Sequence, residues 1–403
     1  MHVVVVGAGV IGVTTAYYLS ELGCQVTVVE RASGVADGAS YANAGQLSYS
    51  FTDALAKPQF VARVPGMVAG RDHAYSVRLS PDLVPWGLRF LSQCTSRRSE
   101  ENTVAVLQTA MRSEMLMLEL RKRLPFEFSY QSAGKLVLLS TAKELHDAEA
   151  AVALKKAHGC ETQILQADAA IDIEPTLADM TEAFVAAVYS KSDSVADSHL
   201  FTVGLKEMLE NSGRVNFRLG VRVKRLRKAG QRLHAIELED GELSADAVVV
   251  CAGAWSGKLL GTVGINPHIQ PVRGYSLTLP QGDAAPNVSI TVLNKKIVFS
   301  RVNGRVRIAG FADFRGFRTD KDAQRIDTLL AVARDSAPRA ADYDTHELNR
   351  WGGFRPMTPN GRPRVGPSGI DGLYLNTGHG MLGWTLACAS GYDVAQSVAE
   401  NIL

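Results

Sequence analysis

Three glycines near the start of the chain, Gly7, Gly9 and Gly12, have the G-x-G-x-x-G spacing of a turn that binds the pyrophosphate of a dinucleotide. Four valines precede them, as in a buried parallel strand, and residues 14–22 follow with a helical pattern. In such a turn Gly7 permits the tight bend, Gly9 lets the backbone approach the phosphates, and Gly12 lets the helix pack close to the strand. The N-terminus of that helix would offer its free N–H groups to the phosphates.

An acidic residue lies where the same motif requires one. A second strand is expected over residues 25–30, and it ends in Glu30, which can bind a ribose hydroxyl about 20 residues after the glycine turn. A glycine-rich turn in an unrelated α/β protein is the alternative, but the turn, strands, helix and acid together predict a bound dinucleotide. The cofactor contacts expected here are Gly7, Ala8, Gly9, Val10, Ile11, Gly12, Glu30 and Arg31.

A second motif in the middle of the chain favours FAD over NAD as that dinucleotide. Residues 245–251 form an apolar strand that ends in Ala252-Gly253 and then opens a helix, which would carry the chain back to the pyrophosphate side. The dipeptide Glu30-Arg31 also suits FAD, with Glu30 on the adenosine ribose. We therefore expect Ala252 and Gly253 to lie at the cofactor.

The composition excludes several other classes of protein. The chain has 403 residues and a net charge of +2, which argues against a nucleic-acid partner. Its five cysteines lie far apart and no H-E-x-x-H or G-x-S-x-G occurs, so no metal site or serine nucleophile is expected. Residue 3 already belongs to a strand and no apolar run reaches about 18 residues, so we expect a cytoplasmic protein without a signal peptide.

One segment leaves peripheral contact with the inner membrane open. Residues 81–91 mix Trp, Phe and Leu with Arg, as an interfacial segment does. Packing of these side chains inside the protein is at least as compatible with the pattern, and an apolar patch could equally mark a partner subunit.

The nucleotide-domain signatures occur at the start, middle and end of the chain, with helical and antiparallel segments between them. We therefore predict an α/β fold in which a discontinuous Rossmann-like FAD-binding domain is interleaved with an α+β substrate-binding domain built on an antiparallel sheet. The active site should lie where the two domains meet. The FAD-binding domain would comprise residues 1–50, 190–265 and 352–403, and the substrate-binding domain residues 51–189 and 266–351.

Two local predictions concern the segment before and after residue 200. A polar patch could form before the helix expected over residues 198–211, from Lys191, Asp193, Asp197 and His199, and its simplest interpretation is a solvated helix cap. The apolar pattern of residues 215–226 predicts one continuous strand after that helix.

Longer segments identify a family. The chain resembles the FAD-dependent D-amino-acid dehydrogenases of the glycine oxidase and D-amino-acid oxidase superfamily over nearly its whole length. The segments that carry this resemblance are residues 3–12, 42–46 (ANAGQ), 273–278 (RGYSLT), 353–361 (GFRPMTPNG) and 375–385 (LNTGHGMLGWT).

The resemblance implies which residues carry the chemistry. Arg355 would bind the α-carboxylate of the substrate, and a planar guanidinium suits that role because it can donate two parallel hydrogen bonds. Tyr275 would donate to the same carboxylate, although a buried packing tyrosine is nearly as compatible. His379 is expected beside the flavin, where it orders the loop rather than shuttling protons.

The remaining cofactor contacts also follow from the resemblance. The glycine-rich loop before the last helix should wrap the isoalloxazine ring, because glycines expose backbone N–H groups and permit close approach. The helix that follows would stabilise negative charge on the reduced flavin. The residues expected at the cofactor are Ser40, Asn43, Ala44, Gly45, Gln46, Val223, Gly378, Gly380, Met381, Leu382 and Gly383.

The expected reaction is oxidative deamination of a D-amino acid to a 2-oxo acid and ammonia. A hydride would pass from the α carbon to flavin N5, and the electrons would continue to a quinone or another acceptor. Two alternatives remain open: an amino-acid oxidase that uses oxygen, and a D-proline or hydroxyproline dehydrogenase that works with partner subunits. The sequence leaves the substrate side chain, the acceptor and the oligomeric state undecided.

Overall fold

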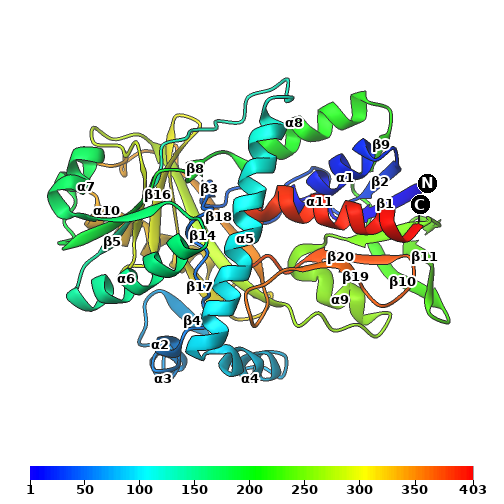
Figure 1. Ribbon diagram of the computed structural model, residues 1–403, viewed down its shortest axis with the longest axis horizontal. Coiled ribbons are helices and arrows are strands. Elements are labelled where there is room, and N and C mark those ends of the chain that lie inside the picture. The colour runs from blue at the N-terminus through cyan, green and yellow to red at the C-terminus, as the bar shows by residue number, and fades with distance from the viewer. Residues whose placement is uncertain (403) are drawn as a thin grey trace.

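The computed structural model describes residues 1–402, which form two lobes built on different sheets (Figure 1). The first lobe holds a six-stranded sheet that is parallel except for β19 at one edge. Its spatial order is β19 (Arg364–Pro367), β20 (Leu373–Thr377), β13 (Ala247–Val250), β1 (His2–Val6), β2 (Gln25–Val29) and β9 (Val215–Arg218). Strands from the start, middle and end of the chain thus share one sheet, which confirms the discontinuous Rossmann-like fold.

The first strand explains why the valine run is uninterrupted. Val3 and Val5 pack into the core formed with one layer of helices, whereas Val4 and Val6 pack into a separate core on the opposite face. The helical layer comprises α1 (Val10–Glu21), α5 (Ser96–Arg121), α8 (Ser198–Asn211) and α11 (Gly383–Ile402). The opposite face is covered by α9 (Ser256–Gly261) and a small sheet of β10 (Val223–Ala229), β11 (Arg232–Leu238) and β12 (Gly241–Leu243).

The second lobe is built on a nine-stranded, mainly antiparallel sheet, as predicted. Two of its pairings, β5 with β15 and β4 with β17, are parallel. The order is β18 (Asn349–Met357), β14 (Gln270–Pro280), β17 (Arg305–Phe314), β16 (Ile297–Val302), β15 (Ser289–Val292), β5 (Lys135–Leu139), β7 (Ala186–Ser190) and β6 (Thr162–Gln166), with β4 (Tyr75–Val77) beside β17.

Helices and a two-stranded ladder complete the second lobe. β3 (Gln46–Leu47) pairs with β8 (Ser194–Val195) where the lobes adjoin. The short helices α2 to α4 form a projection at the lower end of the molecule in Figure 1. The helices of this lobe are α2 (Pro58–Val61), α3 (Val64–Val68), α4 (Leu83–Gln93), α6 (Ala142–Ala157), α7 (Ala167–Ile173) and α10 (Asp322–Ser336).

Three features differ from the sequence-based expectations. The strand expected over residues 215–226 is two strands in different sheets, because Gly220 adopts a left-handed backbone (φ 73°) between β9 and β10. The domain boundary placed at residue 352 lies inside β18, which pairs with β14 along its length. Helix α5, expected in the substrate-binding domain, packs on α11 and contributes Met117 to the core of the first lobe (Figure 1).

We expect Gly12→Ala to destabilise the first lobe, because a Cβ at Gly12 would lie 1.8 Å from the carbonyl oxygen of Gly7. Since both groups belong to the backbone, α1 must move away from β1, at a cost of about 1–3 kcal/mol or more. Thermal unfolding followed by circular dichroism measures this. The control is Gly257→Ala in α9, where a Cβ meets nothing within 4 Å; a helical Gly→Ala change should be neutral or stabilising by up to about 1 kcal/mol. Equal stability of the Gly12→Ala variant and the wild type would contradict the packing argument.

Candidate active site

A cavity of about 1370 Å³ runs between the two lobes. One end is lined by the glycine turn and Glu30, and its walls continue past Arg355 to β5 and α6 of the second lobe. Pockets for a single small ligand usually span about 300–1,000 Å³. The cavity is therefore large enough for a dinucleotide together with a second, smaller ligand.

The glycine turn is shaped by contacts that exclude side chains. Gly7 has a left-handed backbone (φ 109°), and a Cβ there would lie 2.6 Å from the carbonyl oxygen of Cys251. The backbone N–H of Val10, in the first turn of α1, donates to Oγ of Ser40 (3.0 Å). Ser40 thus joins the next loop to the helix N-terminus, where an anion is favoured by the helix dipole.

Glu30 closes the other side of the turn. Its Oε2 accepts from the N–H of Ala8 (2.8 Å), and its Oε1 accepts from the N–H of Ala32 (2.9 Å). Each carboxylate oxygen has further lone pairs. The carboxylate is therefore held at the cavity wall with capacity left for hydroxyl donors.

An aromatic cluster forms the wall beside Glu30. The guanidinium of Arg31 lies 3.7 Å from the centre of the Trp255 ring, and Trp255 in turn contacts Phe317 and Phe354. Burial lowers the pKa of Arg31, although the guanidinium remains charged. Trp255 was not predicted as a site residue; its signal was its position directly after the Ala252-Gly253 motif.

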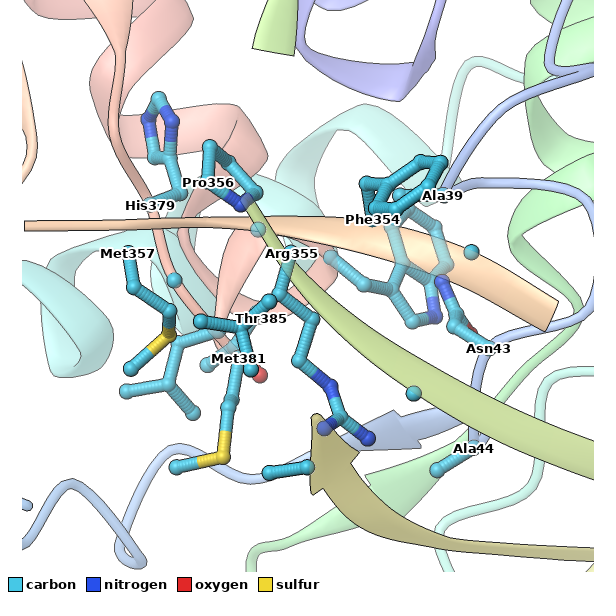
Figure 2. A pocket seen from close by; sticks show the side chains of 18 of the residues that line it. Ala39, Asn43, Ala44, Phe354, Arg355, Pro356, Met357, His379, Met381 and Thr385 are labelled. Carbon is cyan, nitrogen blue, oxygen red and sulfur yellow. The ribbon is translucent and has the colours of Figure 1, made fainter. Parts of the chain in front are cut away.

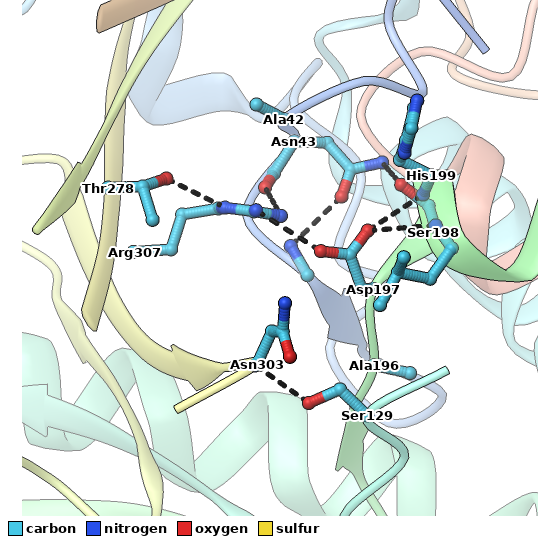
Figure 3. A network of polar contacts seen from close by, with 12 residues as sticks. Ala42, Asn43, Ser129, Ala196, Asp197, Ser198, His199, Thr278, Asn303 and Arg307 are labelled. Carbon is cyan, nitrogen blue, oxygen red and sulfur yellow. Dashed lines mark hydrogen bonds and ion pairs between the residues drawn. The ribbon is translucent and has the colours of Figure 1, made fainter. Parts of the chain in front are cut away.

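A polar network fixes the segment around Asn43 (Figure 3). The side chain of Asn43 donates to Oγ of Ser198 (2.8 Å) and accepts from the N–H of Gly45 (2.9 Å). Ser198 donates to the carbonyl of Ser40 (2.7 Å). Gly45 is required here, since its φ is 69° and a Cβ would lie 2.6 Å from Val302.

An ion pair between Arg307 and Asp197 lies at the centre of this network (Figure 3), with 3.3 Å between the atoms and 8% of each side chain exposed. Asp197 also accepts from the N–H groups of His199 and Leu200, so it caps α8 from a buried position. Asp193 is buried too and accepts from Ser50. The prediction of a solvated cap was therefore wrong, because a cation from β17 reaches this helix end.

The glycine-rich loop before α11 is docked on the end of β18. Gly378 and Gly380 have left-handed backbones (φ 81° and 58°), and the N–H of Gly380 donates to the carbonyl of Pro356 (2.9 Å). A Cβ at Gly378 would lie 2.7 Å from the Thr358 side chain. The loop therefore presents its backbone and the start of α11 to the cavity.

Two buried polar atoms in this wall have no hydrogen-bond partner within the described part of the chain: Nε2 of His379 and Oδ1 of Asn376. Such orphaned groups are rare in proteins and call for a ligand. Burial lowers the pKa of His379 to about 3, so its imidazole is neutral and unsuited to shuttling protons. The residues present here thus fit a flavin, which offers both donors and acceptors along its edge.

Arg355 extends from β18 into the cavity, away from His379 (Figure 2). Its Nη1 donates to the carbonyl of Phe311 (2.6 Å), whose backbone is left-handed (φ 61°). Within residues 1–402 no carboxylate forms an ion pair with it, and burial lowers its pKa. The guanidinium lies against Gly274, where a Cβ would be 2.4 Å from Cζ. A half-buried cation without a carboxylate partner can bind an anion, and the missing side chain at Gly274 makes room for its guanidinium.

Tyr275 is more deeply engaged than expected. Its hydroxyl donates to Asp313 (2.9 Å), and Asp313 pairs with Arg325 (2.8 Å). Burial, reinforced by Asp313, raises the pKa of Tyr275 well above its usual value. The ring lines the cavity, but the hydroxyl proton is committed to Asp313, so the role of Tyr275 at a substrate carboxylate stays a prediction.

Most of the predicted site residues line this one cavity. Four of them lie behind the wall, where they determine the course of the backbone rather than line the cavity: Ala8, Gly12, Gly45 and Gly378. Across residues 1–402 no group of three or more His, Cys, Asp or Glu side chains is arranged to hold a metal ion. The predicted residues in the wall are Gly7, Gly9, Val10, Ile11, Glu30, Arg31, Ser40, Asn43, Ala44, Gln46, Val223, Ala252, Gly253, Tyr275, Arg355, His379, Gly380, Met381, Leu382 and Gly383.

The chain is similar to known proteins over nearly its whole length. The profile of the DAO family, described as FAD dependent oxidoreductase, matches residues 2–397. The chain is 41% identical to D-amino acid dehydrogenase 2 of Ralstonia nicotianae, with 100% of this chain and 97% of the relative covered. It is 37% identical to D-amino acid dehydrogenase of Methylobacterium radiotolerans, with coverage of 99% and 96%. The fold is similar to that of glycine oxidase from Geobacillus kaustophilus (TM-score 0.76, 23% identity, coverage of 99% and 94%).

We expect Asp197→Asn to lower the free energy of unfolding by about 3–5 kcal/mol, because it leaves the buried Arg307 without its counter-charge. Asparagine still caps a helix well, so loss of the cap cannot account for such a change. Chemical denaturation measures it. The matched control is Asp327→Asn, which removes the exposed carboxylate partner of the exposed Arg350 and should cost less than about 1 kcal/mol. Similar small effects from both variants would contradict a special role for the Arg307–Asp197 pair.

Proposed function

Because this chain belongs to the DAO family of FAD-dependent oxidoreductases, we propose that it oxidises D-amino acids to 2-oxo acids and ammonia and passes the electrons to a quinone or another acceptor. The observation that carries the proposal is Arg355, a half-buried guanidinium without a carboxylate partner in the wall of a cavity large enough for FAD and a substrate. The names of the curated relatives support the choice of D-amino acids.

FAD would occupy the part of the cavity between the glycine turn and the loop before α11. Glu30 has acceptor capacity for the adenosine ribose, and the turn at Gly7 with the start of α1 suits the pyrophosphate. The loop before α11 and Nε2 of His379 are available to the isoalloxazine ring. When bound, FAD would supply the acceptor for the hydride of the substrate α carbon.

The side chains of this chain would bind and orient rather than transfer protons. Arg355 would hold the α-carboxylate through parallel hydrogen bonds, which fixes the position of the α carbon as well as the charge. Because burial lowers the pKa of His379 to about 3, its imidazole would not accept the proton of the substrate amine. Water would hydrolyse the released imine.

We expect the FAD-loaded protein to be bleached under anaerobic conditions by D-amino acids and not by their L-isomers. Stopped-flow absorbance with paired D- and L-alanine, D- and L-glutamate and D-proline measures the rates. Bleaching by L-isomers alone, or by no amino acid, would overturn the proposal, and a rate for D-proline far above the others would favour the cyclic-amine alternative. Reoxidation by oxygen, compared with a short-chain quinone, decides between oxidase and dehydrogenase.

The matched variants for this experiment are Arg355→Met and Arg350→Met on the same strand. Arg350 is exposed and pairs with Asp327. The Arg355→Met variant should lose about 10²–10³-fold in kcat/KM, as expected for a buried charge pair with the substrate. It should keep its FAD and its Tm, because it removes a half-buried charge that no carboxylate compensates. Loss of activity in both variants alike would speak against Arg355 as the carboxylate anchor.

A peripheral membrane contact through α4 is part of the proposal, since a quinone acceptor resides in a bilayer. Leu83, Trp86 and Phe90 of α4 are buried, whereas Leu88 is 65% exposed on the outer side. The segment 57–98 carries seven Lys and Arg residues against two Asp residues, a balance that favours an anionic surface. Over residues 1–402 no helix is long and apolar enough to cross a bilayer, so the contact would be interfacial. The exposed apolar residues of this region are Val61, Val68, Leu79, Val84, Leu88 and Leu91.

We expect Leu88→Glu to weaken binding to vesicles of phosphatidylglycerol and phosphatidylcholine by about tenfold or more, because burial of one leucine contributes about 1.5–3 kcal/mol. Co-sedimentation at low and high salt measures the binding. Met115→Glu on α5 is the control, since Met115 is exposed (61%) and lies outside the projection. Equal binding of the two variants, or no binding by the wild type, would contradict this contact.

A further inference from the structure

The cavity has an arm beyond Arg355 that the reaction described so far does not use. It follows β5 and α6, where Lys57, Lys135 and Lys155 contribute to its wall. Lys57 and Lys155 both pair with Asp53, so one carboxylate serves two ammonium groups. Burial alone would raise the pKa of Asp53, but these two cations hold it below its usual range.

Lys135 is the unusual member of this group. Its side chain is 3% exposed, and its Nζ donates to Oγ of Ser48 (2.9 Å) and Oε1 of Gln46 (3.1 Å). The ammonium also lies 4.2 Å from the centre of the Phe51 ring. Within the described residues it forms no ion pair, unlike Lys155. A lysine buried to this extent is almost always paired, so its neutral partners leave a charge to be matched.

The nearest acid does not match that charge. Asp193 stabilises the charged form of Lys135 through space. Its oxygens, however, accept from the N–H and the hydroxyl of Ser50, both at 2.9 Å. Asp193 does not line the cavity, and burial raises its pKa. The ammonium therefore keeps an attraction for an anion that enters from the cavity side.

Strand register places Lys135 on the same face of the sheet as the rest of the cavity wall. Side chains alternate along a strand, so Lys135, Val137 and Leu139 of β5 share one face, and all three line the cavity. Val137 pairs with Thr291 of β15, which pairs with Val298 of β16, and both of these also line it. Arg355 and Lys135 are thus cations in one wall of the cavity, and strands β14, β17, β16 and β15, which contribute largely apolar side chains to that wall, lie between β18 and β5 in the sheet.

We infer that Lys135, with Lys57 and Lys155 beside it, forms a second carboxylate subsite, and that the preferred substrates are D-amino acids with an acidic side chain. The inference rests on the proposed function and specifies its substrate class. Arg355 would hold the α-carboxylate, and the distal carboxylate would complete the coordination of Lys135. The apolar wall between them suits the methylene groups of a dicarboxylic amino acid.

The charge of Lys135 gives the subsite a pH dependence. Burial lowers the pKa of Lys135 to about 8, with a further lowering by Lys155 and opposing contributions from Asp193 and Asp53. Below that pH the ammonium is charged and attracts a carboxylate; above it the attraction fades. Comparing D-glutamate with D-glutamine cancels the titration of the substrate amine, which both share.

We expect wild-type enzyme at pH 7 to have a kcat/KM for D-glutamate at least about tenfold above that for D-glutamine, an isosteric neutral substrate. The ratio should fall as the pH rises through 8. In the Lys135→Met variant the ratio of kcat/KM values should be about one both at pH 7 and above pH 8. The change should come from loss of activity on D-glutamate rather than from a gain on D-glutamine. Lys135→Arg keeps the charge and should retain most of the ratio. D-aspartate and D-2-aminoadipate, measured alongside, identify the chain length that the subsite accepts.

The control variant is Lys156→Met, which removes an exposed lysine adjacent to Lys155 on α6 and should leave the ratio unchanged. A wild-type ratio of one or less, or an unchanged ratio in Lys135→Met, would overturn the inference. The ratio measured for the wild type tests the inference even if the Lys135→Met variant does not fold. Failure of the proposed function looks different, because then neither D-glutamate, D-glutamine nor D-alanine bleaches the flavin.

Discussion

The two lobes are joined by a buried ion pair, and the geometry of the cavity depends on it. Arg307 projects from β17 of the large sheet, and Asp197 begins α8 of the nucleotide-binding lobe. The same guanidinium also donates to the carbonyl of Asn43, so the segment around Asn43 is tied to this ion pair. Such a pair adds little net stability compared with apolar side chains, but a displaced partner would leave a charge buried. The pair therefore restricts how the lobes can sit relative to each other.

Two cations in the cavity wall, one buried and one half-buried, have no carboxylate partner within the described residues. Arg355 and Lys135 are cations held by neutral acceptors, and their burial works against folding. The left-handed backbone of Phe311, whose carbonyl holds Arg355, adds strain at the same place. These residues lower the stability of the free protein at a place where a bound ligand can restore it. Active sites often have this effect on the stability of a protein.

Local patterns predicted much of the fold and the cofactor side of the site. The valine run, the turn at Gly12 and the acid at Glu30 lie within one βαβ unit, so their spacing alone defines the geometry. The roles of residues that depend on a partner in another strand or lobe could not be predicted from local sequence patterns. Gly274 matters because Arg355 lies against it across β14 and β18, and Asp197 is buried because Arg307 arrives from β17. Lys135 appeared as one polar residue in a strand, and only the register of the sheet turns it into the cavity.

The cations in the cavity wall also help to explain how the proposed reaction can proceed without a general base. Transfer of a hydride from the α carbon requires the neutral amine, and an ammonium group loses its proton more easily where nearby charges are positive. The carboxylates of the substrate offset part of this potential, so the effect is strongest when Arg355 and Lys135 are only partly neutralised. His379 adds no competing positive charge, because its burial keeps the imidazole neutral. The groups that hold the substrate by its carboxylates would thus also lower the pKa of its amine, and one set of side chains would serve both binding and deprotonation.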